Sequence, residues 1–435
     1  MLKDAYILSS ILRLYRLGTE YSIKLLGSVF LLKKISEDYL AKKTTYNIDD
    51  EHLFEPADVF LEDNSSTLRL KKCLKFLADN NIILKDVLYI DFPDSIDLSS
   101  LINKVDECDI NSFSTILEYL YLVMTSRFGV YVIPKTEDLV KKLIINSNID
   151  VNEIYNPCID NGNFIFNLKD INCKYYGHIN DRSKEWVIKV KLLLLDNSCE
   201  NVIASSSITE PFFDNREFDC VICAPTIGIK INPTFFIHKL PSQGVEHVHN
   251  LFSEGLYVID CINHLSDSGI GLIFVPNMFL FNLMNIEVRE MLVKNNYIDS
   301  VISLGQIIDK SGVSLSLLVI RKNKKNKNIQ FIDTCEEDNT KDLRKSILNT
   351  DINKVIEEYN STEETENKVI LPIDKISDSY ILQVDNYLVK EKPNPIDTGR
   401  LYEDIRKLNK ELAGNKVMFK YHLNEIRKLV ESEVK

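Results

Sequence analysis

The sequence is poor in glycine, which makes up 14 of its 435 residues, roughly 3% where ~7% is usual. Glycine is the residue that lets a backbone approach a phosphate or nucleotide closely without steric conflict. Few positions in this chain therefore suit the glycine-rich loops that bind such ligands. Walker-type, GxSxG and EF-hand patterns are also missing from the sequence.

Long apolar runs and an excess of positive charge are missing as well. The longest apolar run near the start, 25–32, is far shorter than the ~20 residues of a membrane span, and no cleavable signal precedes it. We therefore expect a cytoplasmic protein without membrane contact. The 52 basic and 64 acidic side chains give a net charge of −12, so any DNA contact requires a local patch or a partner.

The nine cysteines are an odd number, which predicts free thiols in a reducing compartment. Cys220 and Cys223 are close in sequence, but residues three apart on a strand point to opposite faces and cannot hold one metal ion. His247 and His249 precede a helical segment and have no second group of ligands. The sequence therefore predicts no metal site.

Hydrophobic periodicity predicts four regions. Residues 1–127 have apolar side chains at three- and four-residue spacing, which indicates an N-terminal helical domain. Residues 128–335 alternate short apolar segments with helical ones, which is typical of an α/β domain. Residues 336–370 are polar and acidic, and we expect a loop or linker. Residues 371–435 form a C-terminal segment that ends in a helix.

Valine- and isoleucine-rich segments in the α/β domain predict a doubly wound, Rossmann-like sheet that is mostly parallel. The segments 299–304 and 314–322 are joined by a short connection without a helix, so one of them is expected to be antiparallel. A parallel sheet with one antiparallel strand near its end favours the methyltransferase variant of the α/β fold over the dehydrogenase variant.

The C-terminal helix carries a heptad stripe, which predicts packing against another helix in this chain or in a partner. The apolar residues on its seam are Leu401, Ile405, Leu408, Leu412, Phe419, Ile426 and Leu429. A basic turn, 321–327, places five basic side chains in seven residues. We interpret this turn as a solvated link between two strands, with a DNA-backbone contact as the alternative.

The order of these pieces resembles the M subunit of type I restriction–modification systems, a family of adenine-N6 DNA methyltransferases. The most specific stretches are FDCVICAPTIG (218–228) and GIGLIFVPNMFLF (269–281), followed by the helix and by IDSVISLG (298–305). In that family a corresponding strand ends in Val-Pro-Asn before a short Phe-Leu segment. The resemblance covers nearly the whole chain and implies S-adenosylmethionine as cofactor if the chain is active.

The resemblance places the cofactor-binding motifs on residues that depart from the family pattern. A Thr-Pro pair that binds the methionine end corresponds to Ile133 and Pro134. The loop Asp-Pro-x-Cys-Gly-Ser-Gly-Gly-Phe corresponds to NPCIDNGNF, which begins at Asn156, has Asp160 in place of a glycine and retains Gly162. The side chain and charge of Asp160 therefore lie where the family positions the carboxylate of the cofactor.

Two further sites also lack the family's functional groups. The acidic residue that accepts hydrogen bonds from the ribose corresponds to Ile179, which has no acceptor. The catalytic Asn-Pro-Pro-Phe holds the amino group of a flipped adenine and stacks on its ring. The matching positions are Ala224, Pro225, Thr226 and Ile227.

We therefore predict a catalytically silent relative that assembles with other protein subunits, including a DNA-specificity-type subunit bound through the helical segments. It uses no cofactor, and DNA is contacted, if at all, through the complex. One alternative is an active adenine-N6 methyltransferase that uses a shifted motif, Asn232, Pro233 and Phe235. The second is a protein that binds another small molecule in a cleft lined by the aromatic side chains of Tyr131, Tyr155, Phe164, Tyr175 and Tyr176.

Overall fold

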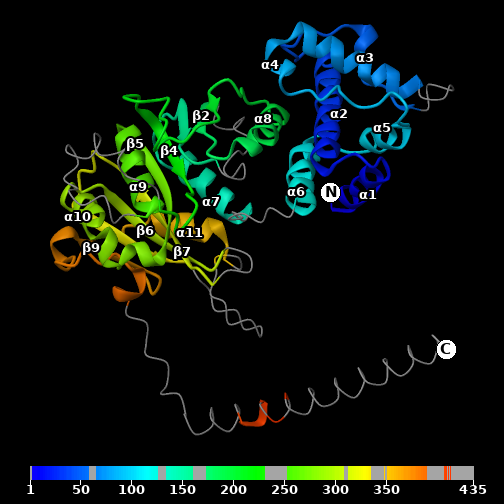
Figure 1. Ribbon diagram of the computed structural model, residues 1–435. Coiled ribbons are helices and arrows are strands. Elements are labelled where there is room, and N and C mark those ends of the chain that lie inside the picture. Colours follow the sequence, from blue (N-terminus) through cyan, green and yellow to red (C-terminus); the bar gives the residue numbers. More distant parts are fainter. Residues whose placement is uncertain are drawn as a thin grey trace. The chain divides into compact units, whose positions relative to one another are not determined.

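A computed structural model places the elements of this chain (Figure 1). The chain divides into two compact units, Met1–Leu388 and Val389–Lys435. The structure describes residues 2–57, 65–125, 134–159, 173–230, 252–307, 312–334, 347, 350–388, 406–408, 410 and 412.

The first part of the larger unit is helical, as predicted. The long helix α2 (Thr19–Leu40) packs against its neighbours through a buried apolar face, and Phe30 stacks on Phe113 with ring centroids 4.0 Å apart. Apolar residues three and four apart place that face on one side of the helix. The helices around it are α1 (Leu2–Leu14), α3 (Ser65–Asn80), α4 (Ile82–Lys85), α5 (Ser99–Asp106) and α6 (Phe113–Thr125).

The second part is an α/β fold, which confirms the predicted class. Within the described residues, nine strands form one sheet of order β3-β2-β1-β4-β5-β7-β6-β8-β9. The parallel strands are β1 (Glu153–Asn156), β2 (Lys174–His178), β3 (Val202–Ile203), β4 (Phe218–Cys223), β5 (Leu265–Pro276), β6 (Ile298–Gly305) and β8 (Asn328–Asp333).

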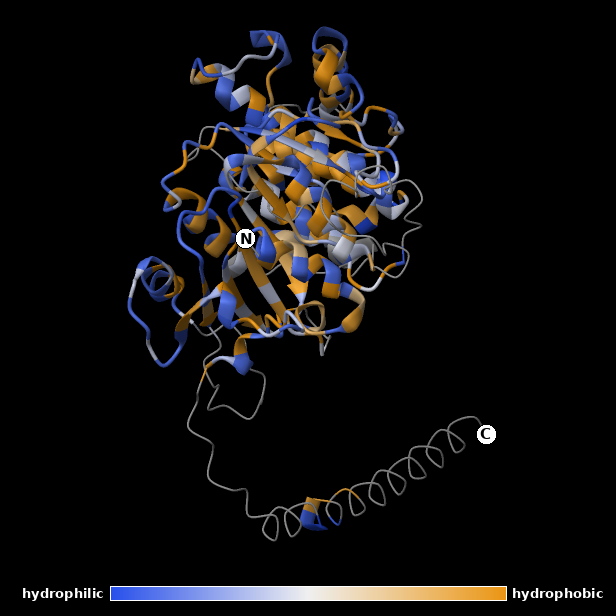
Figure 2. Ribbon diagram, turned by 90° about the vertical axis from the view of Figure 1, so that its left-hand side faces the viewer, coloured by the Kyte–Doolittle hydropathy of each residue, from blue (hydrophilic) through white to orange (hydrophobic). Residues whose placement is uncertain are grey.

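One strand lies antiparallel between β5 and β6, as the short connection predicted. This strand, β7 (Leu315–Ile320), pairs with β5 on one side and β6 on the other. Too few residues separate β6 and β7 for a crossover helix, and a parallel arrangement would need one. The central strands are predominantly hydrophobic (Figure 2), because helices cover both faces of the sheet.

The prediction of a loop or linker at 336–370 is wrong for part of that segment. Residues Ile352–Asn360 form the helix α11, which buries Ile352, Val355, Ile356 and Tyr359. A further strand, β9 (Lys368–Pro372), pairs antiparallel with β8, so the sheet has a second antiparallel strand that the sequence did not predict. The prediction followed the high acidic content of 336–370 and did not take account of the helical spacing of the apolar residues in α11.

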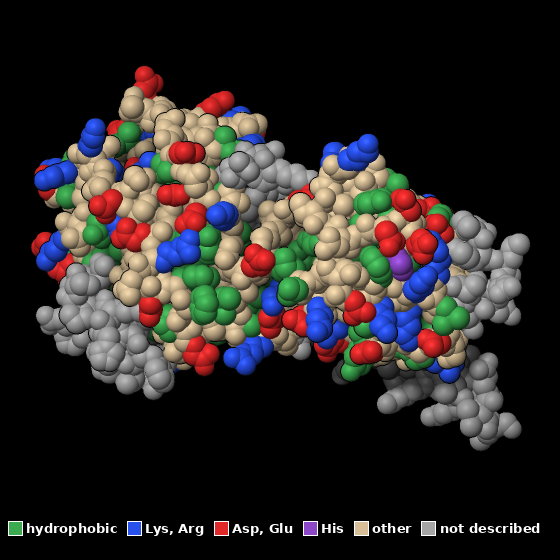
Figure 3. All heavy atoms as spheres, turned by 90° about the horizontal axis from the view of Figure 1, so that it is seen from above, with side chains coloured by type: hydrophobic (Ala, Val, Ile, Leu, Met, Phe, Trp, Pro, Cys, Tyr) green, Lys and Arg blue, Asp and Glu red, His purple; other side chains and the backbone are tan. Residues whose placement is uncertain are grey.

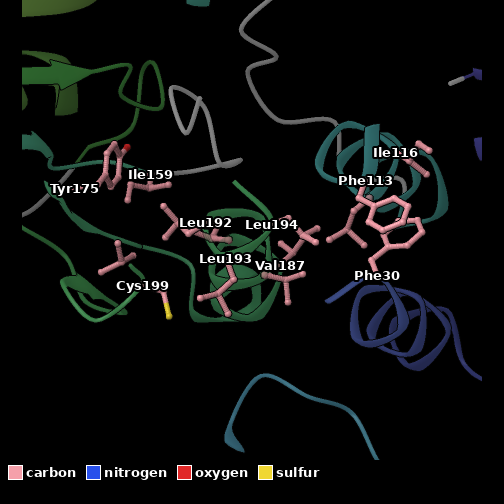
Figure 4. Close-up of a cluster of buried hydrophobic side chains, with 14 of the residues drawn as sticks. Phe30, Phe113, Ile116, Ile159, Tyr175, Val187, Leu192, Leu193, Leu194 and Cys199 are labelled. Atoms are coloured by element: carbon pink, nitrogen blue, oxygen red, sulfur yellow. The ribbon is translucent and has the colours of Figure 1, made fainter. Parts of the chain in front are cut away.

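The α/β part has four further helices, α7 (Pro134–Ile145), α8 (Glu185–Leu194), α9 (Ser253–His264) and α10 (Ile286–Lys294). Helix α8 joins the helical part to the sheet in one hydrophobic core. Its apolar side chains lie between Phe30 and Phe113 on one side and Ile159 and Tyr175 on the other (Figure 4). The two parts therefore bury apolar surface together.

Polar contacts reinforce this junction. The Trp186 indole donates to the backbone oxygen of Val87 at 2.6 Å, and the absence of a side chain at Gly27 leaves room for its ring. A Cβ atom at position 27 would lie 2.6 Å from the ring. Lys34 forms ion pairs with Asp38 and Asp196.

The cysteine geometry predicted for β4 is confirmed. Cys220 packs into the core on one face of the sheet and Cys223 into the core on the other. His247 and His249 lie outside the described residues. Over the part of the chain that the structure describes, no helix is long and apolar enough to cross a membrane.

Candidate functional site

The sheet reverses its winding between β1 and β4, because the chain proceeds outward from β1 to β3 and then returns to β4. In open α/β sheets, ligands bind outside the carboxyl ends of the strands at such a switch point. The residues that follow β1, β2 and β4 are therefore the candidate site, and the sequence predicted the same three places.

The end of β1 is closed by internal hydrogen bonds. The side chain of Asn156 is fully buried, and its Nδ2 donates to the Tyr175 hydroxyl at 3.1 Å. Its Oδ1 accepts the backbone N–H of Cys158 at 3.0 Å. Both ends of the amide are therefore bound within the protein.

Ile159 occupies the space next to β2. It is fully buried, its N–H donates to the His178 carbonyl at 2.9 Å, and its side chain lies over Gly177. A Cβ atom at Gly177 would be 2.5 Å from Ile159 Cδ1 and 2.7 Å from the Asn156 carbonyl oxygen. A glycine is thus required at position 177 because Ile159 and the Asn156 carbonyl pack closely against it, and the sequence around Ile159 and Gly177 gives no sign of this contact.

Ile179 follows β2 directly and is fully buried. Its N–H donates to the Ile203 carbonyl at 2.8 Å, which extends the pairing toward β3. The side chain offers no hydrogen-bond acceptor at the position that the resemblance assigns to ribose recognition. Figure 4 shows Ile159 and Tyr175 beside the apolar side chains of α8.

The segment after β4 is fixed to the start of α9. Ala224 and Pro225 are buried, and Thr226 and Ile227 are half-buried. The Ser253 hydroxyl donates to the Thr226 carbonyl at 2.7 Å. These four residues provide neither a side-chain amide nor an aromatic ring.

The next residues of that segment bind α9 as well. The Gly228 N–H donates to the Glu254 carboxylate at 3.2 Å, and the Ser253 N–H donates to the Ile229 carbonyl at 2.8 Å. Gly228 has φ +74°, a conformation that favours glycine. Ser253 and Glu254 are both about 1% exposed, so they hold the chain in place and face no solvent cleft. The sequence showed them only as the beginning of a helical segment.

Three of the aromatic residues that were expected to line a cleft, Tyr155, Tyr175 and Tyr176, lie in packed cores. Tyr155 stacks on Phe218 with ring centroids 4.7 Å apart, and Tyr176 contacts the same ring. Tyr175 points to the opposite face of the sheet and is also buried. These three side chains therefore give no support to a small-molecule cleft.

A buried polar cluster lies at the C-terminal end of α9. His264 Nδ1 is 2.8 Å from the Arg216 carbonyl, and its Nε2 is 3.4 Å from Asp260 Oδ1. Since a carbonyl only accepts, Nδ1 donates to it. Burial raises the pKa of Tyr155 well above its usual value, and the nearby Asp260 carboxylate raises it further. This cluster is sealed from solvent, so its role is internal.

The basic turn between β7 and β8 is largely occupied by internal contacts. Arg321 donates to the Ser147 carbonyl at 3.2 Å, and Lys324 donates to the carbonyls of Ile298 and Asn328. Lys322 lies 4.0 Å from Glu217. On the face shown in Figure 3, Lys and Arg side chains are interspersed with Asp and Glu. These contacts favour the structural interpretation of the turn.

Several of the sequence-predicted site residues lie outside the described residues. They are Ile133, Asp160 and Gly162 of the cofactor motifs, Asn232, Pro233 and Phe235 of the alternative catalytic motif, and the aromatic residues Tyr131 and Phe164. Pro134 is the first residue of α7. In the part of the chain that the structure describes, no group of three or more His, Cys, Asp or Glu side chains is arranged to hold a metal ion.

Comparison with known proteins identifies the relatives of this fold. The family model for N-6 DNA methylases matches residues 108–394. The crystal structure of a type I restriction–modification methyltransferase subunit from Streptococcus thermophilus is similar, with a TM-score of 0.73 at 16% identity over 89% of this chain and 98% of that one. A modification subunit of a putative type I restriction enzyme from Vibrio vulnificus has a TM-score of 0.64 at 12% identity, over 91% and 98%.

Proposed function

Since the chain belongs to the N-6 DNA methylase family, we propose that it is a catalytically silent member that serves as a structural or regulatory subunit of a restriction–modification-like complex. The observation that carries this proposal is the apolar closure of the candidate site. Ile159 and Ile179 are fully buried beside β2, and Ala224 is buried after β4. The resemblance assigns a ribose-binding side chain to position 179 and an adenine-binding side chain to position 224.

The chemistry explains why this closure matters. When a ribose enters a dry site that has no charged acceptor, its hydroxyls stay without hydrogen bonds. Each missing hydrogen bond weakens binding by about 1–3 kcal/mol. Catalysis on adenine further requires a polar group held close to the reacting amino group and a ring that stacks on the base. Ala224 supplies no polar side-chain atom, and Ile227 supplies no aromatic ring.

The direct test is isothermal titration of the full chain with S-adenosylmethionine. We expect no binding heat up to about 1 mM, which corresponds to a binding free energy weaker than about −4 kcal/mol. Circular dichroism of the same sample verifies that the protein is folded. Saturable binding at lower concentrations contradicts the proposal.

The competing function is an active adenine-N6 DNA methyltransferase that uses S-adenosylmethionine and the Asn232–Phe235 motif. Transfer of labelled methyl groups to DNA, abolished in Asn232→Ala, would establish that function. We expect no methyl transfer above background in the wild type or in Asn232→Ala, whether each is alone or with partner subunits. The matched control is Asn326→Ala, which alters an exposed asparagine in the turn between β7 and β8.

Partner proteins are part of the proposal. The related crystal structures are described as a methyltransferase subunit and a modification subunit of type I systems. We propose that the C-terminal heptad helix and the N-terminal helices bind a DNA-specificity-type subunit, which brings DNA to the complex. Leu408 and Leu412 on the heptad seam are 63% and 55% exposed. The cysteines within the described residues are all free thiols, which supports a cytoplasmic location.

Deletion of residues 397–435 tests the partner assignment. We expect the shortened protein to fold and to lose co-purification with the specificity-type subunit, because the deletion lies within the separate unit Val389–Lys435. Unchanged association after the deletion contradicts this part of the proposal.

A further inference from the structure

The link between β5 and α10 exposes a group of apolar side chains. It consists of two short 3₁₀ turns, Asn277–Leu280 and Leu283–Asn285, with Phe279 and Leu280 fully buried. The exposed side chains, which we name the β5–α10 patch, are Met278 (48% exposed), Phe281 (45%), Leu283 (80%) and Met284 (40%). Single exposed apolar residues are ordinary, but four within seven positions indicate an interaction surface.

The backbone beneath the β5–α10 patch is held by Arg289, which is fully buried. Its guanidinium donates to the carbonyls of Phe279, Asn282 and Tyr380, each at 2.7 Å. Burial lowers the pKa of Arg289 to about 10, so it keeps its charge at neutral pH. The N–H of Asn277 donates to the Ser314 carbonyl at 2.9 Å. The patch is thus presented on a fixed backbone, which reduces the conformational entropy that this chain loses on binding a partner.

Two segments next to the β5–α10 patch carry acidic residues. Glu287 lies in the first turn of α10, four residues after Leu283, and the exposed Asp378 precedes Ser379, whose carbonyl accepts from Arg289 at 3.4 Å. Of the two cations on α10, Arg289 is buried and Lys294 is paired with Glu290 at 2.5 Å. An apolar surface with an acidic border repels nucleic-acid phosphates, and it complements an apolar segment flanked by Lys or Arg.

We propose that the β5–α10 patch binds an amphipathic helix of a partner protein, with Leu283 as the central contact and basic residues of the helix facing Glu287 and Asp378. Recognition of this type uses the apolar face of a helix for affinity and charge for orientation. The inference goes beyond the proposed function, which assigns partners to the terminal helices. It does not depend on lost catalysis, and cofactor titration leaves it unaffected.

The experiment measures fluorescence anisotropy of a labelled Leu/Lys amphipathic peptide of about 18 residues, titrated with the full chain. We expect a Kd in the micromolar range, which rises about tenfold or more in Leu283→Ser, as is usual for a central contact residue. The matched control is Leu68→Ser, because Leu68 is 51% exposed on α3, far in sequence from the patch. A Leu/Glu peptide of the same length should bind at least about tenfold more weakly, because its charges face Glu287 and Asp378.

Three results overturn the inference. The first is equal affinity of the Leu/Lys peptide for the wild type and Leu283→Ser. The second is a concentration-dependent dimer of the wild type that Leu283→Ser abolishes, since a second copy would then cover the patch. The third is binding of duplex DNA that Leu283→Ser abolishes, since nucleic acid would then be the occupant. The substituted side chains are all exposed, so the variants fold, and circular dichroism verifies it.

Discussion

Apolar side chains at the ends of β1 and β2 point into the protein, whereas four of those that follow β5 are exposed to solvent. Ile159 and Ile179 are fully buried, and Leu283 is 80% exposed. The buried pair contributes to the core shared with α8, and the exposed residue stands on a backbone held by Arg289. The same edge of one sheet therefore holds two surfaces, one closed by packing and one open for binding.

The largest expected effect is at the closed end. Gly177→Val should destabilise the protein by about 4 kcal/mol or more, because the new side chain meets the Asn156 carbonyl oxygen as well as Ile159. Urea unfolding followed by circular dichroism measures the change. Gly312→Ala is the control, since no atom lies within 4 Å of its added Cβ. Equal stability of the two variants would show that β2 is not packed against Ile159.

A matched pair of substitutions compares the two surfaces directly. Ile179→Ser should lower the free energy of unfolding by about 3 kcal/mol, because it leaves a cavity and a buried hydroxyl. Leu283→Ser should change it by less than about 0.5 kcal/mol, because Leu283 is mostly in water. Thermal melting of both variants is sufficient. A large loss in Leu283→Ser would mean that the patch is part of the core.

Arg289→Met tests the scaffold of the open surface. It removes the donor to the carbonyls of Phe279, Asn282 and Tyr380, so we expect a loss of about 2–3 kcal/mol in stability. Binding of the Leu/Lys peptide should weaken as well, although Met278, Phe281, Leu283 and Met284 are unchanged. Urea unfolding and anisotropy measure the two effects, and retained peptide affinity would argue that the patch needs no fixed backbone.

A smaller effect is expected at the turn before β8. Burial lowers the pKa of Lys324 to about 8 from an ordinary 10.5. Between these values the unfolded chain binds more protons than the folded one, so the contribution of Lys324 to stability rises with pH. After allowance for solvent screening, we expect the wild type to gain about 1 kcal/mol over Lys324→Met between about pH 7.5 and pH 10.

Unfolding of both proteins at the two pH values measures this gain. A stability difference that does not vary with pH would indicate that Lys324 is exposed and available for other contacts, DNA included.

Much of the fold was predictable from the sequence because its signals are local. Apolar runs such as 269–276 and 298–305 indicated strands, and the short link after β6 indicated the antiparallel β7. The helix α11 was missed because its four buried apolar residues, which lie between Ile352 and Tyr359, are separated by polar ones and stand in a strongly acidic segment. Strand β9 was missed because it pairs with β8 across a long insertion, and a single strand carries no sign of its partner.

The candidate site was predictable in position, and its packing was not. Residue 156 ends a strand that the sequence indicated, and residues 179 and 224 directly follow two others, so their positions were clear. Arg289 binds carbonyls up to 91 residues away, and Gly177 is required by a side chain and a carbonyl on another segment. Such contacts depend on the assembled fold, so neither residue could be identified from its neighbours in the sequence.

The junction at α8 has a practical consequence. Trp186 is the single tryptophan of the chain, and its indole nitrogen donates to the Val87 carbonyl where the helical region meets the sheet. The intrinsic fluorescence of Trp186 therefore reports on that contact. A red shift on addition of a subunit or of DNA would report that the two regions separate, without any label attached to the protein.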